Sequence, residues 1–189
     1  MGQAAVDMRM SAEEFLVWDQ TQTVKHEFVR GDVFAMAGGE DGNAFIALSI
    51  ASAARAHLRG TPCRVLISDV KLRIDAADSF FYPDVMVSCS TADAANRLVK
   101  REPLLAVEVL SPGTAAYDRG EKFAAYRKIE ALREYVLVDP RTRRCDVYRK
   151  GEDGLWVLHP IEAGQALVLA SIACTISPEV LWEDVPPVE

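Results

Sequence analysis

The sequence has few of the features that are typical of disulfide-rich, zinc-binding or membrane-spanning proteins. Its 189 residues include four cysteines and three histidines, with no Cys-x-x-Cys pair and no two histidines at helical ligand spacing. A zinc site is therefore not expected. No apolar run approaches the roughly 18 residues of a membrane span, and the first residues lack a basic segment followed by an apolar one. We therefore expect a cytoplasmic protein with reduced thiols and no membrane contact.

Positive charge is also scarce. The chain carries 21 Lys and Arg against 28 Asp and Glu, a formal net charge of −7. This balance provides no broad basic surface for a polyanion, so any contact with nucleic acid must be weak or local. Half of the residues are apolar, and neither an internal repeat nor a linker divides the chain. A chain of this length can bury a core without disulfides, which predicts a single domain over residues 1–189.

The N-terminal third predicts two helices and a hairpin. Ser11 and Glu14 form a capping box, which indicates a short helix to about Gln20. The turn at residues 30–32 contains a glycine and joins two short apolar runs, as in a β-hairpin. Residues from about 42 to 58 predict a longer helix. Its expected apolar face consists of Ala44, Ala47, Leu48, Ala51, Ala54 and Leu58.

The rest of the chain predicts a mixed α/β fold. Apolar runs predict strands around Asp84 and Glu108, separated by a charged loop at 91–102, and a helix over 118–129 connects the strand of Glu108 to a further strand. The remaining expected strands are 64–67, 70–74, 135–138, 145–148 and 155–158. This order favours a central sheet flanked by helices, with a crossover helix between two of its strands.

Two of these strands each place one acid among apolar residues. Asp84 lies within residues 82–87 and Glu108 within residues 105–110. An unpaired carboxylate in such surroundings costs several kcal/mol, or has a strongly raised pKa, unless it has a partner. The first hypothesis is therefore a site for a divalent cation.

Five segments of the chain, taken together and in this order, also carry a family resemblance: Lys25–Val33, Tyr82–Val85, Val107–Pro112, Asp118–Tyr126 and Glu134–Asp139. The combination resembles the Uma2 family, a restriction-endonuclease-like family of the PD-(D/E)XK nuclease superfamily, over roughly residues 10 to 185. The resemblance implies a restriction-endonuclease-like core, in which a central mixed β-sheet is flanked by helices and an N-terminal β-hairpin is added.

The resemblance further implies a catalytic site made of Glu27, Asp84, Glu108 and Lys122. Asp84 and Glu108 would hold Mg²⁺ or Mn²⁺, with the backbone carbonyl of Val109 and with Glu27 as a direct or water-mediated ligand. The implied reaction is hydrolysis of DNA phosphodiester bonds by a homodimer. In the superfamily a lysine usually stands two residues after the second acid. That position is Leu110 here, so Lys122 would act from the following helix.

An ordinary structural role, without any function in catalysis, could also explain these residues. Glu27 could be an exposed hairpin charge, Asp84 an acid at a strand entry and Lys122 a solvated helix residue. Accordingly, the alternative function is a non-catalytic, dimeric binding or regulatory module on the same fold, which the net charge of −7 and the missing lysine favour. A glycosidase that uses Glu27 and Glu108 would need aromatic sugar platforms, and the three tryptophans lie outside these segments.

Three further features have two readings each. Asp69 and Lys71 form either a surface ion pair or the border of the site. Tyr126, four residues after Lys122, packs either behind that lysine or simply in the core. The apolar segments 166–170 and 180–182 either cover the sheet or form a two-fold contact.

Overall fold

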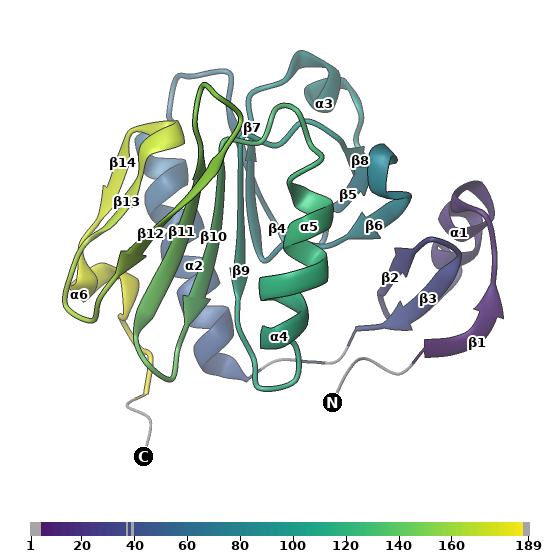
Figure 1. Cartoon of the computed structure of the whole chain (residues 1–189), viewed down its shortest axis with the longest axis horizontal. Coiled ribbons are helices and arrows are strands. Elements are labelled where there is room, and N and C mark those ends of the chain that lie inside the picture. The colour runs from purple at the N-terminus through teal and green to yellow at the C-terminus, as the bar shows by residue number, and fades with distance from the viewer. Residues whose placement is uncertain (1–4, 37, 39, 187–189) are drawn as a thin grey trace.

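Two six-stranded sheets organise the chain, and the expected site residues come from both. The structure, a computed structural model, describes residues 5–36, 38 and 40–186, so the ends of the predicted 1–189 domain lie outside the described residues. The central sheet has the strand order β12-β11-β10-β9-β7-β4 (Figure 1). Its strands are β4 (Arg64–Ile67), β7 (Val85–Ser88), β9 (Leu105–Val109), β10 (Glu134–Asp139), β11 (Arg144–Lys150) and β12 (Trp156–Ile161).

The central sheet is mixed, as the sequence predicts. Strands β9 and β10 are parallel, and the other neighbouring pairs are antiparallel. The connection from β9 to β10 passes through α4 (Ala115–Tyr117), a π-helical turn (Asp118–Lys122) and α5 (Phe123–Tyr126). The predicted crossover is therefore confirmed, although its helix begins earlier than 118, ends at Tyr126 and contains a π-helical turn.

The second sheet, which we call the N-terminal sheet, has the order β1-β3-β2-β6-β5-β8. Its strands are β1 (Ala5–Arg9), β2 (His26–Val29), β3 (Asp32–Ala35), β5 (Lys71–Ile74), β6 (Ser79–Phe81) and β8 (Val99–Lys100). The hairpin of β2 and β3 turns at Arg30 and Gly31, which have φ of 50° and 96°, and the glycine is the residue suited to such a conformation. Helix α1 (Ala12–Asp19) has the predicted capping box between Ser11 and Glu14.

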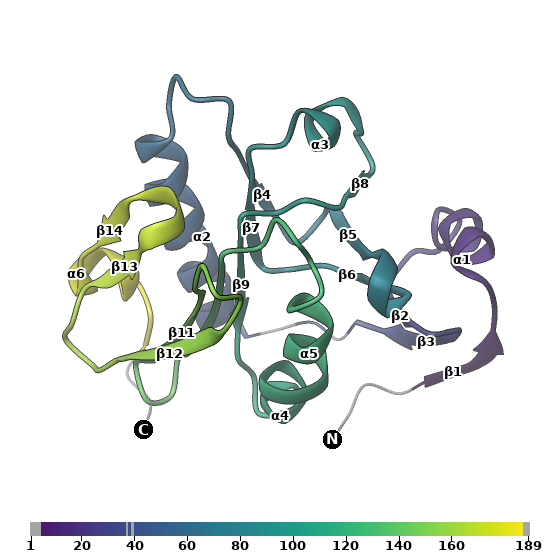
Figure 2. The same cartoon turned by 45° about the horizontal axis from the view of Figure 1, so that its top comes forward.

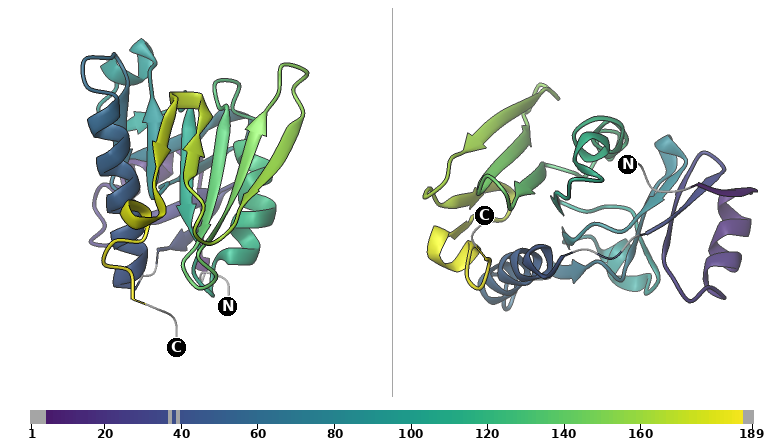
Figure 3. Two further views of the ribbon diagram at one scale, coloured as in Figure 1. Left: turned by 90° about the vertical axis from the view of Figure 1, so that its left-hand side faces the viewer. Right: turned by 90° about the horizontal axis from the view of Figure 1, so that it is seen from below.

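Side-chain alternation along β9 separates two cores. Leu105, Val107 and Val109 pack towards α2 (Asp41–His57), whereas Ala106 belongs to the core that contains Tyr126. Figure 3 shows α2 and the α4–α5 segment on opposite faces of the central sheet. Figures 1 and 2 both show that the α4–α5 segment also lies between the central sheet and the N-terminal sheet.

The C-terminal segments cover the α2 side of the central sheet. Leu167, Leu169 and Leu181 are buried in the same core as α2, which supports the sheet-covering reading of these segments. They belong to β13 (Leu167–Leu169), β14 (Cys174–Ile176) and α6 (Pro178–Leu181). Two 3₁₀ turns complete the described elements, at Asp75–Ala77 and Ala170–Ile172.

Two local predictions are wrong in part. Of the apolar face predicted for α2, Ala51, Ala54 and the following Leu58 are buried, but Leu48 is 63% exposed. Ile46 and Ile50, which were not predicted, complete the buried face. The reason is that the sheet and α6 contact a face rotated towards the isoleucines.

The segment 91–102 is not a plain loop, because it contains α3 (Thr91–Ala95) and β8. Asp93, which is buried, organises it by accepting hydrogen bonds from Ser88 Oγ and from the amides of Arg101 and Glu102.

The expectation of reduced thiols is wrong for two of the four cysteines. Cys63 and Cys89 form a disulfide, whereas Cys145 and Cys174 are free and buried. The bond lies at the end of the paired strands β4 and β7, one position beyond the pair of Arg64 and Ser88. Among the described helices, none has the length and apolar character needed to cross a membrane.

Candidate active site

Lys122 is the centre of a buried cluster of charges. Its Nζ lies 3.0 Å from Oε2 of Glu108, 3.2 Å from Oε1 of Glu27 and 3.6 Å from Oδ1 of Asp118. All four residues are buried, with no more than 5% of their surface exposed. The cluster joins β2 of the N-terminal sheet, β9 of the central sheet and the π-helical turn.

Strand alternation explains why Glu108 reaches this cluster. Its neighbours Val107 and Val109 face α2, so Glu108 faces the crossover segment. There Tyr126 donates a hydrogen bond from its hydroxyl to Oε1 of Glu108 at 2.7 Å. One carboxylate oxygen therefore contacts the lysine, and the other accepts from the tyrosine.

Asp84 lies where the chain passes from the N-terminal sheet to the central sheet. It follows β6 and directly precedes Val85, the first residue of β7. Its Oδ2 accepts a hydrogen bond from the amide of Val109 at 2.7 Å. Asp84 is therefore held against the residue that follows Glu108, although it makes no ion pair with Lys122.

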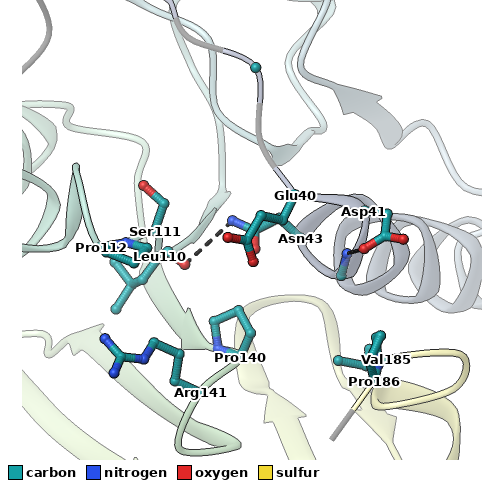
Figure 4. Close-up of a pocket in the computed structure, with 12 residues that line it drawn as sticks. Glu40, Asp41, Asn43, Leu110, Ser111, Pro112, Pro140, Arg141, Val185 and Pro186 are labelled. Carbon is teal, nitrogen blue, oxygen red and sulfur yellow. Dashed lines mark hydrogen bonds between the residues drawn. The ribbon is translucent and has the colours of Figure 1, made fainter. Parts of the chain in front are cut away.

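The end of β9 is also fixed from α2. Asn43 donates from Nδ2 to the carbonyl oxygens of Val109, at 3.3 Å, and Leu110, at 3.4 Å. Figure 4 shows Asn43 beside Leu110 in a pocket that borders this end of the strand. Glu40, Asp41, Ser111 and Arg141 also line that pocket.

Burial sets the protonation of the cluster. It raises the pKa of Glu108 well above the ordinary value, with Lys122 partly offsetting the effect. Burial also raises the pKa of Asp84, against the opposing effects of the Val109 amide and Lys122. Burial alone would lower the pKa of Lys122, but Glu108 and Glu27 raise it well above its ordinary value. Lys122 is therefore a charged ammonium, and Glu108 and Asp84 hold a proton more readily than free acids do.

The structure thus brings three of the four expected site residues into direct contact, with Asp84 beside them. The exposed-hairpin reading of Glu27 and the solvated reading of Lys122 are both wrong, since these side chains are buried. Tyr126 contacts Glu108 as well as packing in the core. The catalytic role of the four residues stays a prediction.

Two polar residues of this region were not predicted. Asp118 precedes Lys122 by four residues, a spacing that places two side chains on one helical face and could have indicated it. No sequence signal indicated Asn43, because its contact with β9 spans 66 residues.

The expected ion pair of Asp69 with Lys71 is wrong. Asp69 pairs instead with Lys25, and Lys71 pairs with the buried Asp19 at 2.8 Å.

The oxygen atoms near the cluster are of the chemical type that binds a hard cation. Asp84, Glu108 and the Val109 carbonyl offer two carboxylates and one backbone oxygen, a ligand type that Mg²⁺ and Mn²⁺ prefer. Within the described ranges, no group of three or more His, Cys, Asp or Glu side chains is arranged to hold a metal ion. The smaller set of two carboxylates and a carbonyl remains compatible with Mg²⁺, which keeps several of its waters.

The fold as a whole matches that of a solved protein. It is similar to the crystal structure of "a putative nuclease belonging to DUF820" from Anabaena variabilis ATCC 29413, with a TM-score of 0.77 and 16% identity. The likeness covers 94% of this chain and 99% of that chain. At this identity the likeness shows the fold alone.

The chain belongs to the Uma2 family, whose model, described as "Putative restriction endonuclease", matches residues 12–177. Two relatives come from Synechocystis sp. (strain ATCC 27184 / PCC 6803 / Kazusa). The protein slr1290 is 36% identical over 174 residues, which is 92% of each chain. The protein sll1609 is 30% identical over 151 residues, or 79% of this chain and 85% of that relative. The family resemblance of the sequence is therefore confirmed.

Proposed function

We propose that this protein is a Mg²⁺- or Mn²⁺-dependent endonuclease that hydrolyses phosphodiester bonds of DNA. One observation carries the proposal. Three buried carboxylates, of Glu27, Glu108 and Asp118, surround the single ammonium of Lys122, and the carboxyl group of Asp84 lies beside them. Such a cluster has more negative than positive charge, which is unfavourable unless protons or a cation balance it. Membership of the Uma2 family supports the same reading.

In this proposal Asp84, Glu108 and the Val109 carbonyl would hold the cation, with Glu27 as a direct or water-mediated ligand. A bound divalent cation lowers the pKa of water and neutralises charge that develops on the phosphate. The chain's own contribution is to fix these ligands before substrate arrives. The Val109 amide orients Asp84, and the Tyr126 hydroxyl orients Glu108.

Lys122 acts in this proposal as a fixed positive charge. A lysine is protonated at neutral pH unless its pKa is strongly lowered, and the ammonium of Lys122, with Glu108 and Glu27 beside it, would not accept a proton from water. Its role is to attract a phosphate oxygen and to stabilise the negative charge that grows there during hydrolysis. The lysine missing at Leu110 is thereby replaced by one from the crossover segment.

The proposal also covers substrate, assembly and location. The net charge of −7 favours weak or local contact with DNA, and a homodimer would bring two sites to two strands.

We propose a cytoplasmic location as well. The Cys63–Cys89 disulfide is the observation that bears against it, and cell fractionation would decide.

The test is cleavage of supercoiled and single-stranded DNA in Mg²⁺, Mn²⁺ or EDTA, with melting temperatures recorded on the same samples. We expect cation-dependent cleavage by the wild type and none by Asp84→Asn or Glu108→Gln. Glu152→Gln, which changes an exposed hairpin residue, serves as the matched control. If the wild type cuts nothing but its cation-induced melting shift disappears in both variants, the protein binds a cation and needs another substrate or an activator. If the wild type neither cuts DNA nor shows a melting shift, the non-catalytic binding module replaces the nuclease.

A further inference from the structure

Asp118 is a buried acid that the proposed reaction does not yet use. Only 3% of its surface is exposed, although its neighbours Arg119 and Gly120 on the crossover segment are exposed. Burying a carboxylate is costly unless a cation or hydrogen bonds compensate for the lost water. Its cation partner among the described residues is Lys122, at 3.6 Å. The position of Asp118 therefore depends on that lysine.

The three acids around Lys122 differ in whether they can keep their ion pair with it when a cation binds. Glu108 approaches it most closely, at 3.0 Å, and Glu27 lies at 3.2 Å. In the proposed reaction, however, Glu108 and Glu27 would both interact with the cation, Glu27 directly or through water. Their negative charge would then be partly neutralised by the cation, which would weaken their attraction to the Lys122 ammonium. Asp118 has no role in binding the cation in this proposal, and it belongs to the same segment as Lys122.

The local backbone favours this pairing. Asp118 and Lys122 are the first and last residues of a single π-helical turn, a rare conformation that is frequent at functional sites. The hydroxyl of Tyr135, on β10, donates to the carbonyl oxygen of Asp118 at 3.1 Å and anchors the turn to the central sheet. The turn therefore holds the two side chains together and faces them towards β9.

We propose that Asp118 is a positioning residue that keeps the Lys122 ammonium over the site when the cation binds Glu108. This inference rests on the proposed function, because it concerns the cation-loaded enzyme. Without Asp118, the Lys122 side chain would shift towards Glu27 and Glu108 or towards solvent. Its ammonium would then no longer lie where it can stabilise charge on the phosphate. Misplacement of a catalytic group by about 1 Å can cost about 10²-fold in rate.

The experiment compares Asp118→Asn, Asp118→Glu and Lys122→Met, with Glu121→Gln as matched control. Glu121 is an exposed acid on the same π-helical turn, so its variant removes the same charge away from the lysine. We expect Asp118→Asn to lower kcat by about 10²-fold while KM and the Kd for Mn²⁺ stay as in the wild type. Asp118→Glu should recover part of the loss, and Glu121→Gln should have no effect.

A double-mutant cycle separates positioning from a merely structural role. If Asp118 acts through Lys122, then Asp118→Asn causes no further loss of kcat in the Lys122→Met background. An additional loss there, or a weakened Kd for Mn²⁺, would overturn the inference, because Asp118 would then act independently or as a ligand. Wild-type kcat in Asp118→Asn would overturn it as well. Should Asp118→Asn fail to fold, Asp118→Glu takes its place in the cycle.

A second measurement remains decisive if the wild type cleaves no DNA. In protein labelled with ¹⁵N-lysine, the Lys122 ammonium signal is identified by its loss in Lys122→Met. We expect its hydrogen exchange with water to be slow in the wild type, with and without Mg²⁺, and to be faster in Asp118→Asn. Inactivity alone defeats the proposed function, whereas an unchanged exchange rate in Asp118→Asn defeats the role of Asp118.

Discussion

The hydroxyl of Tyr126 donates a hydrogen bond of 2.7 Å to Glu108, and both residues are buried. The Tyr126 ring stacks on Phe81, with the centroids 5.6 Å apart, so Tyr126→Phe removes the hydroxyl and keeps the packing. The variant leaves one Glu108 oxygen without its donor, and we expect a loss of about 1–3 kcal/mol in the free energy of unfolding. Urea unfolding measures this loss. An unchanged stability would show that Glu108 does not depend on the tyrosine.

Replacing Lys122 leaves buried carboxylates without their cation. We expect Lys122→Met to lower the free energy of unfolding by about 3–5 kcal/mol, as for other broken buried ion pairs. Glu108→Gln in the same chain should restore part of that stability, because it removes one of the uncompensated charges. Denaturant unfolding of the single and double variants tests both statements. Equal stability of Lys122→Met and wild type would contradict the ion-pair geometry.

Stability in the absence of metal should fall as the pH rises. Burial raises the pKa values of Asp84 and Glu108, so the folded protein binds these two protons more tightly than the unfolded chain does. The stability that these protons contribute is present at low pH and is lost as the pH rises through the folded-state pKa values.

The measurement is the melting temperature in EDTA between about pH 5 and pH 8. We expect a decline in the wild type that is smaller in Asp84→Asn combined with Glu108→Gln, and smaller also when Mg²⁺ replaces EDTA. Subtracting the variant's profile cancels the effect of titrating groups that do not interact with Asp84 or Glu108. A difference that grows in the opposite direction would contradict the raised pKa values.

Asn43 should influence the cation without touching it. Asn43→Ala removes the hydrogen bonds to the carbonyl groups of Val109 and Leu110. Losing a group that orients a metal ligand typically weakens metal affinity by about 10-fold or more. Titration of Mn²⁺ into the wild type and the variant measures this change, with Ser52→Ala, on the same helix, as control. Equal affinities would remove the Val109 carbonyl from the proposed ligand set.

The disulfide should matter for stability and not for the site. Cys63 and Cys89 are 26 residues apart, and a cross-link of this span contributes about 3 kcal/mol. We expect the variant with both cysteines changed to serine to melt at a lower temperature and to retain its Mn²⁺ affinity. A reducing agent should lower the melting temperature of the wild type and leave that of the variant unchanged.

Local signals in the sequence predict much of the fold. The capping box at Ser11 and the glycine turn at residue 31 act within a few residues, and the structure confirms both. The crossover between Glu108 and Tyr135 follows from the order of the elements. The prediction for α2 is right for Ala51 and Ala54 but wrong for Leu48, because the contacts with the sheet and with α6 determine which helix face is buried.

The candidate site shows the same limit. The position of Glu108 within an apolar strand signals that its carboxylate needs a partner, but the identity of that partner depends on folding. Glu27 reaches Lys122 across 95 residues, and Asn43 reaches Val109 across 66. The disulfide likewise depends on the pairing of β4 with β7, which no local sequence pattern predicts.

The most direct test of the central claim is calorimetric titration of Mn²⁺ into the wild type and into the variant that combines Asp84→Asn with Glu108→Gln. If the buried acids form a cation site, the wild type binds Mn²⁺ at one site and the variant does not. Absence of binding to the wild type, or equal binding to both proteins, would contradict the claim that these acids are arranged around a divalent cation.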